Sequence, residues 1–468
     1  MITKPTSTNT WVKHLYLFVV LFIFAACSSD DGITSNPPGE GENPVIPSVS
    51  RVGKLPLIEI NTNGGLIVDE PKINAKITVI EGNSVNYSGN IGIEFRGSSS
   101  LSFPKKGYGI ETKDSQNQDL DVSILGFPEE EDWILHGPFS DKSLMRNMLI
   151  YDLSREIGRY ASRTKFVELQ INASYQGVYV FMEKLKRNKD RIAIERLNAD
   201  ENTGEDLTGG YILKIDKSDR EGYTQQNSFT SQIGSSIGPT PTTEIRFLYD
   251  YPRPDRISAQ QRTYITRYVH DFEAALAGAN FMDPNLGYEA YIDVDSFIDF
   301  FLLNEITNNV DGFRISTFMN KDKNGKLKMG PVWDFNLGFG NADYCSGGST
   351  NVWAYKFNER CPGDFWQVPF WWERLLQDPA YITRLKNRWA QLRGSALSST
   401  NIMGKIEAYV DTLEETGAIE ANFDQWPIFG TYIWPNNFVG QNYAEETDYL
   451  KTWISDRLVW MDGAIGGL

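Results

Sequence analysis

The sequence predicts an α+β fold with two lobes, a strand-rich first lobe followed by a helix-rich second lobe. Short runs with β-branched residues alternate with turn residues from about residue 55 to residue 215. From residue 258 onward, most segments have the apolar spacing of helices. We therefore expect a folded body at 53–468, with the first lobe at about 53–216 and the second at about 257–468.

The first 26 residues have the features of a signal peptide. Lys4 and Lys13 supply positive charge, an apolar run of about ten residues follows at 15–24, and two alanines precede Cys27. This segment resembles the bacterial lipobox, in which the cysteine becomes the lipidated first residue; an ordinary secretory signal with a chance cysteine is the alternative. The resemblance implies a cell-envelope protein that is anchored to the outer membrane. Lipid on Cys27 would then be its only contact with that membrane.

Residues 27–52 are rich in Ser, Gly, Pro, Asn and acidic residues, so we expect a flexible tether. The residues directly after Cys27, Ser-Ser-Asp-Asp-Gly, resemble the acidic export signal of surface lipoproteins in Bacteroidetes-type bacteria. Two alternatives therefore remain: the protein is attached to the outer membrane and exposed at the cell surface, or it is attached without being exposed there.

Composition restricts the partners and the metal chemistry. A net charge of −16 and a pI near 4.8 disfavour nucleic acid, which we do not expect as a partner, because the phosphate backbone would be repelled. After signal removal two histidines remain, His136 and His270, which disfavours a zinc site and leaves carboxylate and amide oxygens as metal ligands. Cys345 and Cys361 either close a loop disulfide or remain two free thiols.

In the first lobe, a helix is expected at 141–158, with Asp141 as its N-cap and Gly158 as its stop. A polar stretch that reaches about residue 241 predicts a long surface loop, and the basic run at 184–191 predicts a solvated face. Strands are expected at seven places: 55–60, 75–80, 91–95, 108–112, 165–171, 177–183 and 211–215.

In the second lobe, the segment 294–308 is apolar nearly all round, which predicts a buried central helix. Further helices are expected at 258–276, 370–377, 379–392, 401–416 and 442–460. A group of aromatic residues is interpreted as core, with a glycan-stacking platform as the alternative: Phe365, Trp366, Phe370, Trp371, Trp372, Trp426, Tyr432 and Trp434.

The segment 308–340 carries the candidate chemistry. Two β-like runs, 315–320 and 326–332, flank an Asn-Gly pair, which is the strongest short hairpin signal. Because an antiparallel hairpin returns the chain to its starting end, Asp311 and Asp334 should lie near each other there. Two converging carboxylates suit a hard divalent cation, or one carboxylate that orients a nucleophile beside another that holds metal. Ion-pair or capping roles remain the alternative.

Protein kinases use the same layout, with a catalytic aspartate, a metal-binding asparagine, a hairpin and then a second, metal-binding aspartate. At this point the chain resembles the spore-coat CotH kinases, which are atypical protein kinases of the secretory type. The resemblance runs from about residue 55 to residue 462. It is carried by segments at 93–111, 141–158, 177–192, 209–216, NNVDGF, PVWDFNLGFG and 449–462.

The resemblance implies a two-lobed, atypical protein-kinase-like fold with Mg or Mn as metal and ATP as co-substrate. It makes Asp311 the aspartate that accepts the substrate hydroxyl proton and Asp334 the metal-holding aspartate. Asn336 stands where many relatives have a further aspartate, and Ser316 stands where the family commonly has asparagine. Both changes weaken the expected ligand set, because a neutral or shorter group is a poorer metal ligand.

Phosphoryl transfer also needs cations over the phosphates. Arg96 begins a basic, hydroxyl-rich turn after a strand, which can present donors to an anion. Lys105 and Lys106 are either phosphate ligands or part of a solvated loop. Arg146 can reach a phosphate or pair with an acid, and Glu183 can orient Lys184 or cap the next element.

Three functions are compatible with this pattern. The first is a divalent-metal-dependent kinase that moves the γ-phosphoryl of a nucleotide to a hydroxyl of an acceptor protein. The second is a catalytically silent kinase-like surface lipoprotein that binds a protein or glycan, which Ser316 and Asn336 favour. The third is a hydrolase that uses the same two aspartates.

Overall fold

The computed structural model of the chain describes residues 51, 53–218, 222–237 and 243–468. The predicted signal peptide, Cys27 and nearly all of the predicted tether lie outside the described residues. Strands and helices both occur, so the α+β prediction is confirmed. Within the described ranges, none of the helices combines the length and the apolar composition needed to cross a bilayer.

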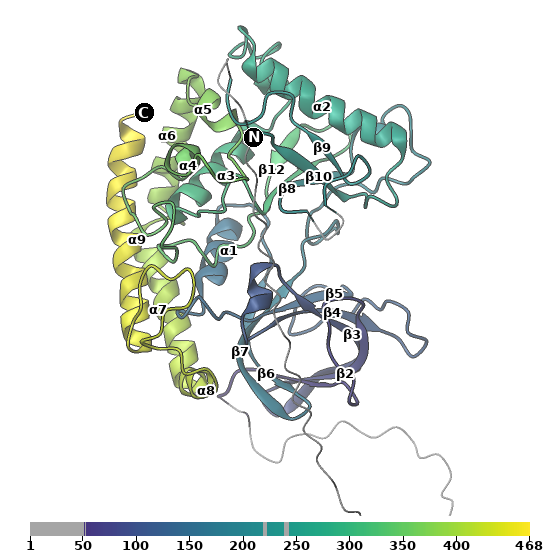
Figure 1. Ribbon diagram of the computed structural model, residues 1–468, viewed down its shortest axis with the longest axis vertical. Helices are drawn as coiled ribbons and strands as arrows, with labels where there is room; N and C mark the ends of the chain where they lie inside the picture. The colour runs from purple at the N-terminus through teal and green to yellow at the C-terminus, as the bar shows by residue number, and fades with distance from the viewer. Residues whose placement is uncertain (1–50, 52, 219–221, 238–242) are drawn as a thin grey trace, which may run out of the picture. The chain divides into compact units, whose positions relative to one another are not determined.

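Seven strands close into a barrel in the order β1-β2-β3-β4-β5-β7-β6 (Figure 1). A parallel pairing of β1 with β6 closes it, and the other neighbours are antiparallel. Because side chains alternate along a strand, Ile77 and Val79 fill the barrel while Lys76 faces water. The strands are β1 (Leu57–Asn61), β2 (Ile73–Glu81), β3 (Ser84–Arg96), β4 (Gly107–Lys113), β5 (Asp132–His136), β6 (Thr164–Ile171) and β7 (Ser174–Glu183).

Helix α1 (Arg146–Glu156) connects β5 to β6 and begins later than the sequence indicates. The prediction that Asp141 is its N-cap is wrong, because Met145 occupies that position. The Asp141 carboxylate instead reaches in from the preceding loop and accepts a hydrogen bond of 2.9 Å from the backbone N–H of Arg146. Asp141 therefore still satisfies one of the free amides of the first turn. Gly158, at φ +89°, ends the segment as expected.

A second sheet has the strand order β12-β11-β8-β10-β9. Its central strand β8 pairs with β10 and β11, so it belongs to this sheet, although the expected boundary near residue 216 assigned it to the first lobe. Sequence patterns do not identify a strand's pairing partner, and β9 and β10 were not expected. The strands are β8 (Tyr211–Ile215), β9 (Ser228–Thr230), β10 (Arg246–Tyr251), β11 (Thr317–Lys321) and β12 (Leu327–Met329).

Helix α3 (Val294–Thr307) is the buried centre of the helical part, as predicted, and contacts β12, α6 and α9. All of its residues except Asp295 are buried. The other helices are α2 (Ala259–Ala277), α4 (Phe357–Arg360), α5 (Trp371–Leu375), α6 (Pro379–Arg393), α7 (Ser399–Glu415), α8 (Ala418–Gln425) and α9 (Tyr443–Gly466), and short 3-10 turns are η1 (Ser99–Ser102), η2 (Asp206–Thr208), η3 (Tyr288–Ala290) and η4 (Ala354–Lys356).

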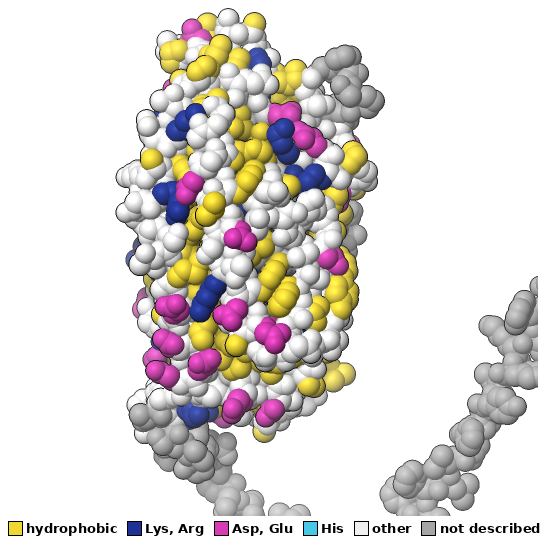
Figure 2. All heavy atoms as spheres, turned by 90° about the vertical axis from the view of Figure 1, so that its left-hand side faces the viewer, with side chains coloured by type: hydrophobic (Ala, Val, Ile, Leu, Met, Phe, Trp, Pro, Cys, Tyr) yellow, Lys and Arg dark blue, Asp and Glu magenta, His cyan; other side chains and the backbone are white. Residues whose placement is uncertain are grey.

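Charge is unevenly spread over the face on which α9 lies. Figure 2 shows acidic side chains gathered toward the lower end of this face, whereas most of its Lys and Arg side chains lie toward the upper end. The net charge of −16 therefore does not act as a uniform field on this face.

Candidate active site

Three carboxylates and two cations converge where the β11–β12 hairpin opens. Asp311 lies between α3 and β11, and Asp334 follows β12. Burial raises the pKa of Asp334 to about 7, and the negative charges of Asp311 and Asp216 add to this rise. The positive charges of Arg96 and Lys217 oppose it. The structure thus brings the two predicted aspartates within electrostatic reach of each other, together with a third.

Asp216 is the site residue that the sequence analysis missed. It directly follows β8, and its carboxylate accepts hydrogen bonds from the backbone N–H of Lys217 at 2.9 Å and of Ser316 at 3.3 Å. Burial raises its pKa. The segment 209–216 carried part of the family resemblance, so a signal existed. The pairing of β8 with β11, which sets Asp216 beside the hairpin, was not predictable from the pattern.

The backbone around both aspartates is strained. Left-handed φ angles occur at Phe313 (+69°), Ser316 (+50°) and Asp334 (+61°), and also at Asn308 (+43°) and Phe339 (+52°). Such a conformation costs a side chain-bearing residue about 1–2 kcal/mol, so surrounding contacts must stabilise it. Strain of this kind gathers at sites where side chains are aimed for function.

Helix α1 stabilises the strained Asp334 segment. The Tyr151 hydroxyl accepts a hydrogen bond of 3.1 Å from the backbone N–H of Asp334, and Asn147 Oδ1 accepts one of 2.7 Å from Phe335. Asn147 and Tyr151 are four residues apart and therefore share one helix face. The Tyr151 ring also stacks on Trp333, with centroids 5.9 Å apart. Helix α1 thereby fixes the backbone on both sides of the Asp334 side chain.

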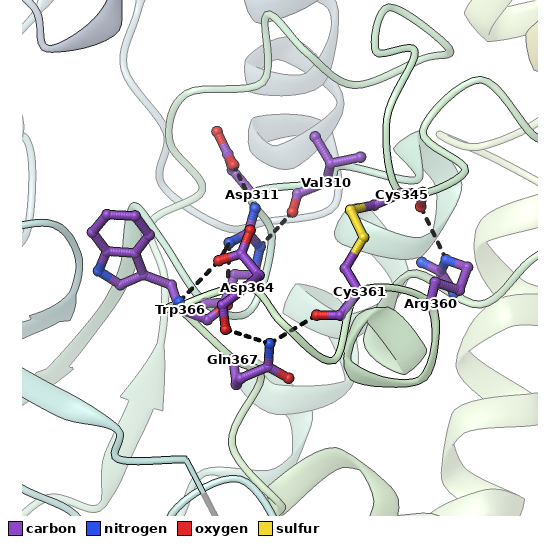
Figure 3. The surroundings of a disulfide bond; sticks show 9 residues. Val310, Asp311, Cys345, Arg360, Cys361, Asp364, Trp366 and Gln367 are labelled. Carbon is purple, nitrogen blue, oxygen red and sulfur yellow. Dashed lines mark hydrogen bonds and ion pairs between the residues drawn. A yellow bond between two sulfur atoms is a disulfide. The ribbon is translucent and has the colours of Figure 1, made fainter. Parts of the chain in front are cut away.

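Arg314 orients Asp311 (Figure 3). Its Nη2 donates to Asp311 Oδ1 at 3.1 Å, while Nη1 donates to Asp364 Oδ1 at 3.1 Å and to the Trp366 carbonyl at 3.2 Å. Its Nε donates to the carbonyl of Val310 at 2.7 Å. Because the guanidinium is 2 % exposed and rigid, it fixes both the direction of the Asp311 carboxylate and the loop beyond it.

Ser316 and Asn336, the two expected metal ligands that depart from the family pattern, lie close to the aspartates in the chain. Ser316 is 9 % exposed, and its backbone N–H contacts Asp216. Asn336 is partly exposed, and its backbone carbonyl accepts a hydrogen bond of 2.8 Å from Asn341. The Ser316 hydroxyl and the Asn336 amide oxygen therefore stay candidate metal ligands.

Arg96, the last residue of β3, is the predicted cation that lies within electrostatic reach of Asp334. Burial lowers the pKa of its guanidinium, and the charge of Asp334 partly restores it. The guanidinium lies 5.3 Å from the ring centroid of Trp333. Its Nη1 is buried, and the residues that the structure describes offer it no hydrogen-bond partner. A buried donor without a partner costs about 1–3 kcal/mol, so this nitrogen fits an anion such as a phosphate oxygen.

The other predicted cations are engaged elsewhere. Lys105 is buried and donates to Asn422 of α8 at 2.7 Å, so it is neither a solvated residue nor directed at the aspartates. Lys106 donates to the carbonyl of Leu101 at 2.5 Å. Of the two roles left open for Arg146, the structure shows the acid pairing, since Nη1 lies 2.5 Å from Asp141.

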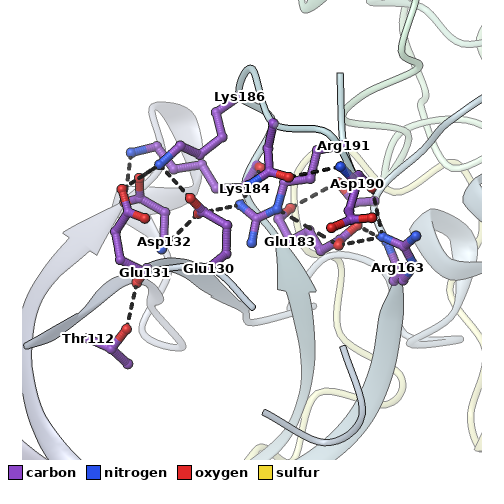
Figure 4. A network of polar contacts seen from close by, with 12 residues as sticks. Thr112, Glu130, Glu131, Asp132, Arg163, Glu183, Lys184, Lys186, Asp190 and Arg191 are labelled. Atoms are coloured by element: carbon purple, nitrogen blue, oxygen red, sulfur yellow. Dashed lines mark hydrogen bonds and ion pairs between the residues drawn. The ribbon is translucent and has the colours of Figure 1, made fainter. Parts of the chain in front are cut away.

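Glu183 belongs to an ion-pair network (Figure 4). It accepts a hydrogen bond of 2.7 Å from Arg163 and lies 3.8 Å from Arg191, whereas Lys184 pairs with Asp132 at 3.1 Å. The interpretation that Glu183 orients Lys184 is therefore wrong, because consecutive side chains of an extended chain point to opposite faces. Arg191 is 3 % exposed, so the basic run is not a solvated face throughout.

One set of three acidic oxygens lies within 4.8 Å of one another in the described part of the chain, and it belongs to Asp121, Glu130 and Glu131. Lys186 pairs with Glu130 at 2.8 Å and with Glu131 at 2.6 Å, so cations already neutralise this cluster. The carboxylates of the candidate site are more widely spaced. A metal there would complete its shell with water or phosphate oxygens, as Mg²⁺ usually does.

Cys345 and Cys361 form a disulfide, with Cα atoms 5.8 Å apart, which decides the alternative that the sequence left open. Arg360 donates to the carbonyl of Cys345 at 3.0 Å, and Gln367 donates to that of Cys361 at 3.0 Å (Figure 3). The crosslink therefore joins the segment that follows Asp334 to the loop that Arg314 fixes.

Loss of the disulfide should lower stability by about 3 kcal/mol, because it closes a loop of 16 residues. We expect the Cys345→Ser/Cys361→Ser variant to unfold at lower urea concentration than the parent, and dithiothreitol to shift the parent but not the variant. Equal unfolding midpoints for the oxidised and reduced parent would contradict this prediction.

Asp334 should make stability depend on pH in metal-free buffer. Its pKa is about 7 in the folded chain and about 3.9 in an unfolded one, so between these values the folded state binds the extra proton. Stability is therefore lost as the pH rises from 4 to 7. An Asp334→Asn variant lacks the titrating carboxyl and should not show this loss. In EDTA, its melting temperature relative to that of the parent should therefore increase between pH 5 and pH 8. Parallel curves would show that the Asp334 carboxyl is not perturbed.

Aspartates that gather at the open end of a hairpin, and a buried arginine nitrogen to which the described residues offer no partner, are features that phosphoryl-transfer sites share. The model of the family described as CotH kinase protein matches residues 93–461. The chain therefore belongs to the CotH kinase protein family, as the sequence resemblance implied. The matched range includes Arg96, Asp216, Asp311 and Asp334. None of the curated proteins matches the chain.

Proposed function

We propose that the chain is a divalent-metal-dependent atypical protein kinase that transfers the γ-phosphoryl of ATP to a hydroxyl of a protein outside the cytoplasm. The observation that supports it best is the electrostatic state of Asp334. Its carboxyl is crowded by two like charges, which a bound cation would relieve. The buried Nη1 of Arg96 supplies a place for a phosphate oxygen on the same side.

The roles follow from the placements. Asp334 holds Mg or Mn, with Asp216, Asn336 and Ser316 as further candidate ligands. When bound, the metal neutralises phosphate charge and fixes the nucleotide. Arg96 binds a phosphate oxygen, as described above.

Asp311 accepts the proton of the acceptor hydroxyl, and Arg314 holds the Asp311 carboxylate in one orientation for this task. Lys217 adds positive charge near Asp334.

We further propose that the barrel is the first lobe of a kinase-like pair and that the second sheet with its helices is the other. The lobe boundary then follows β7, and β8 belongs to the second lobe. The expected segments at 1–26 and 27–52 keep their proposed roles as signal peptide and tether. Lipid on Cys27 would hold the enzyme at the outer membrane of the cell envelope, and the net charge of −16 supports the absence of a nucleic-acid partner.

A catalytically silent body is the second candidate. Ser316 and Asn336 favour it, because each weakens the ligand set that the family commonly uses. In that case the same site would bind a partner or a nucleotide without transfer. A location outside the cytoplasm, where ATP is scarce, also favours the catalytically silent candidate.

Nucleotide binding and transfer separate these candidates. The full chain carrying Cys27→Ser, which cannot be lipidated, is titrated with ATP in the presence of Mg²⁺ or Mn²⁺ and then incubated with γ-labelled ATP and envelope proteins. Metal-dependent binding together with labelled protein supports the kinase. Metal-dependent ATP binding without labelled protein supports the catalytically silent protein. Absence of ATP binding overturns both the kinase and a silent protein that binds nucleotide.

A further inference from the structure

The predicted aromatic group separates into two populations. Phe370, Trp371 and Trp372 are 0–2 % exposed and pack in the core, as predicted. By contrast, Phe365, Tyr432 and Trp434 are 66 %, 50 % and 53 % exposed, and they are the most exposed aromatic side chains of the described residues. A folded chain gains nothing from keeping such large apolar faces in water, and exposed patches of this kind mark interaction sites.

We call the aromatic rim these exposed side chains together with the two rings that contact Trp434 and Phe365, in two groups whose segments the Cys345–Cys361 disulfide joins: Tyr344, Tyr432 and Trp434 in one, Phe365 and Trp366 in the other. Trp434 stacks on Tyr344 with ring planes 6° apart and centroids at 6.2 Å. Tyr432 donates to the Asp343 carboxylate at 2.6 Å, and Phe365 contacts Trp366 at 5.1 Å. Each aromatic side chain is thus held by a neighbour.

The aromatic rim borders Asp311. The charges of Asp311 and Asp364 contribute to the raised pKa of Tyr344, whose largest cause is burial. The Trp366 carbonyl accepts from Arg314, the same guanidinium that orients Asp311. The disulfide at Cys345, the residue after Tyr344, fixes the two halves of the rim to each other. The rim therefore lies on the acceptor side of the candidate site.

The rim fits carbohydrate better than a basic peptide. A sugar ring presents an apolar C–H face that packs on an aromatic plane, and hydroxyls that donate to carboxylates such as Asp343 and Asp364. A cationic side chain would meet the charge of Asp343, but Asp364 is already paired with Arg314, and Lys217, 5.5 Å from the ring centroid of Trp366, would repel a second cation.

We infer that the aromatic rim binds a glycan chain on the acceptor and thereby presents that acceptor to Asp311. This inference rests on the proposed function for the role of the acceptor, but the binding itself requires neither nucleotide nor metal. Trp434 supplies the main stacking face, since its ring is exposed and supported from behind by Tyr344.

The test is affinity gel electrophoresis of the full chain carrying Cys27→Ser, without ATP, in gels containing soluble xylan, mixed-linkage β-glucan, galactomannan or mucin. At least one glycan should retard the chain, and Trp434→Ala should weaken that retardation at least tenfold. The matched control is Val459→Ala on α9, which removes an apolar side chain that is 76 % exposed and should change nothing. Circular dichroism of each variant checks that it is folded.

The inference is overturned if none of these glycans retards the chain, or if Trp434→Ala and Val459→Ala migrate alike. Binding of poly-lysine that is lost in Trp434→Ala would also overturn it, in favour of a peptide-docking rim. ATP titration of the same samples keeps the two proposals apart. Normal nucleotide binding without glycan binding contradicts the rim alone, and glycan binding without nucleotide binding contradicts the kinase alone.

Discussion

Replacing Asp311 by asparagine should lower phosphoryl transfer by about 10²–10⁴-fold, which is the contribution typical of a positioned general base, while nucleotide binding persists. Asparagine keeps the size of the side chain and its hydrogen bond to Arg314 but cannot take the hydroxyl proton. The measurement is the transfer of label from γ-labelled ATP, beside calorimetric titration of ATP with Mg²⁺ or Mn²⁺.

Asp334→Asn should behave differently from Asp311→Asn, because it removes the charge that holds the metal. We expect it to lose metal-dependent nucleotide binding as well as transfer. Asp456→Asn, an exposed aspartate on α9, is the matched control and should leave both properties unchanged. Equal transfer by the parent and Asp311→Asn would remove Asp311 from the chemistry.

Replacing Glu305 by alanine should destabilise the chain by about 3–5 kcal/mol, because it leaves the Arg457 guanidinium buried and unpaired. Both residues are 0 % exposed, and their charged groups lie 3.1 Å apart between α3 and α9. The Glu305 carboxylate also accepts the backbone N–H groups of Ala354 at 2.8 Å and Tyr355 at 2.9 Å. Urea and thermal unfolding measure the loss.

The control for Glu305 is an exposed ion pair. Lys356→Ala breaks a contact of 3.0 Å to Glu359, in which the two side chains are 37 % and 57 % exposed, and should cost less than about 1 kcal/mol. A Glu305→Leu/Arg457→Met variant should regain part of the lost stability, because it removes both buried charges. If Glu305→Ala unfolds within 1 kcal/mol of the parent, the buried pair is not a major support of α3.

Local patterns predicted most elements of the fold. The Asn-Gly hairpin, the apolar helix α3 and the alternating barrel strands each carry their own periodicity, and the structure contains them all, although β3 begins at Ser84 instead of 91 and β12 ends at Met329 instead of 332. Strand β5 was missed because four of its five residues are buried, so it lacks alternation. The placement of β8 failed for another reason, because pairing between distant strands leaves no trace in either segment alone.

The site was predictable where its parts are close in sequence. Asp311 and Asp334 flank one hairpin, so the return of the chain through its turn brings them together. Asp216, Asn147 and Tyr151 come from other elements, and only the fold places them beside Asp334. The same limit explains Lys105 and Glu183, because Asn422 is remote in sequence and Arg163 lies just before the neighbouring strand β6.

The hydrogen bonds of α1 also connect the barrel to the site. Because α1 lies in the chain between the barrel strands β5 and β6 and accepts the backbone N–H groups of Asp334 and Phe335, one helix joins these two parts. The direction of the Asp334 carboxylate is therefore set by a helix far from the hairpin in sequence as well as by the hairpin itself.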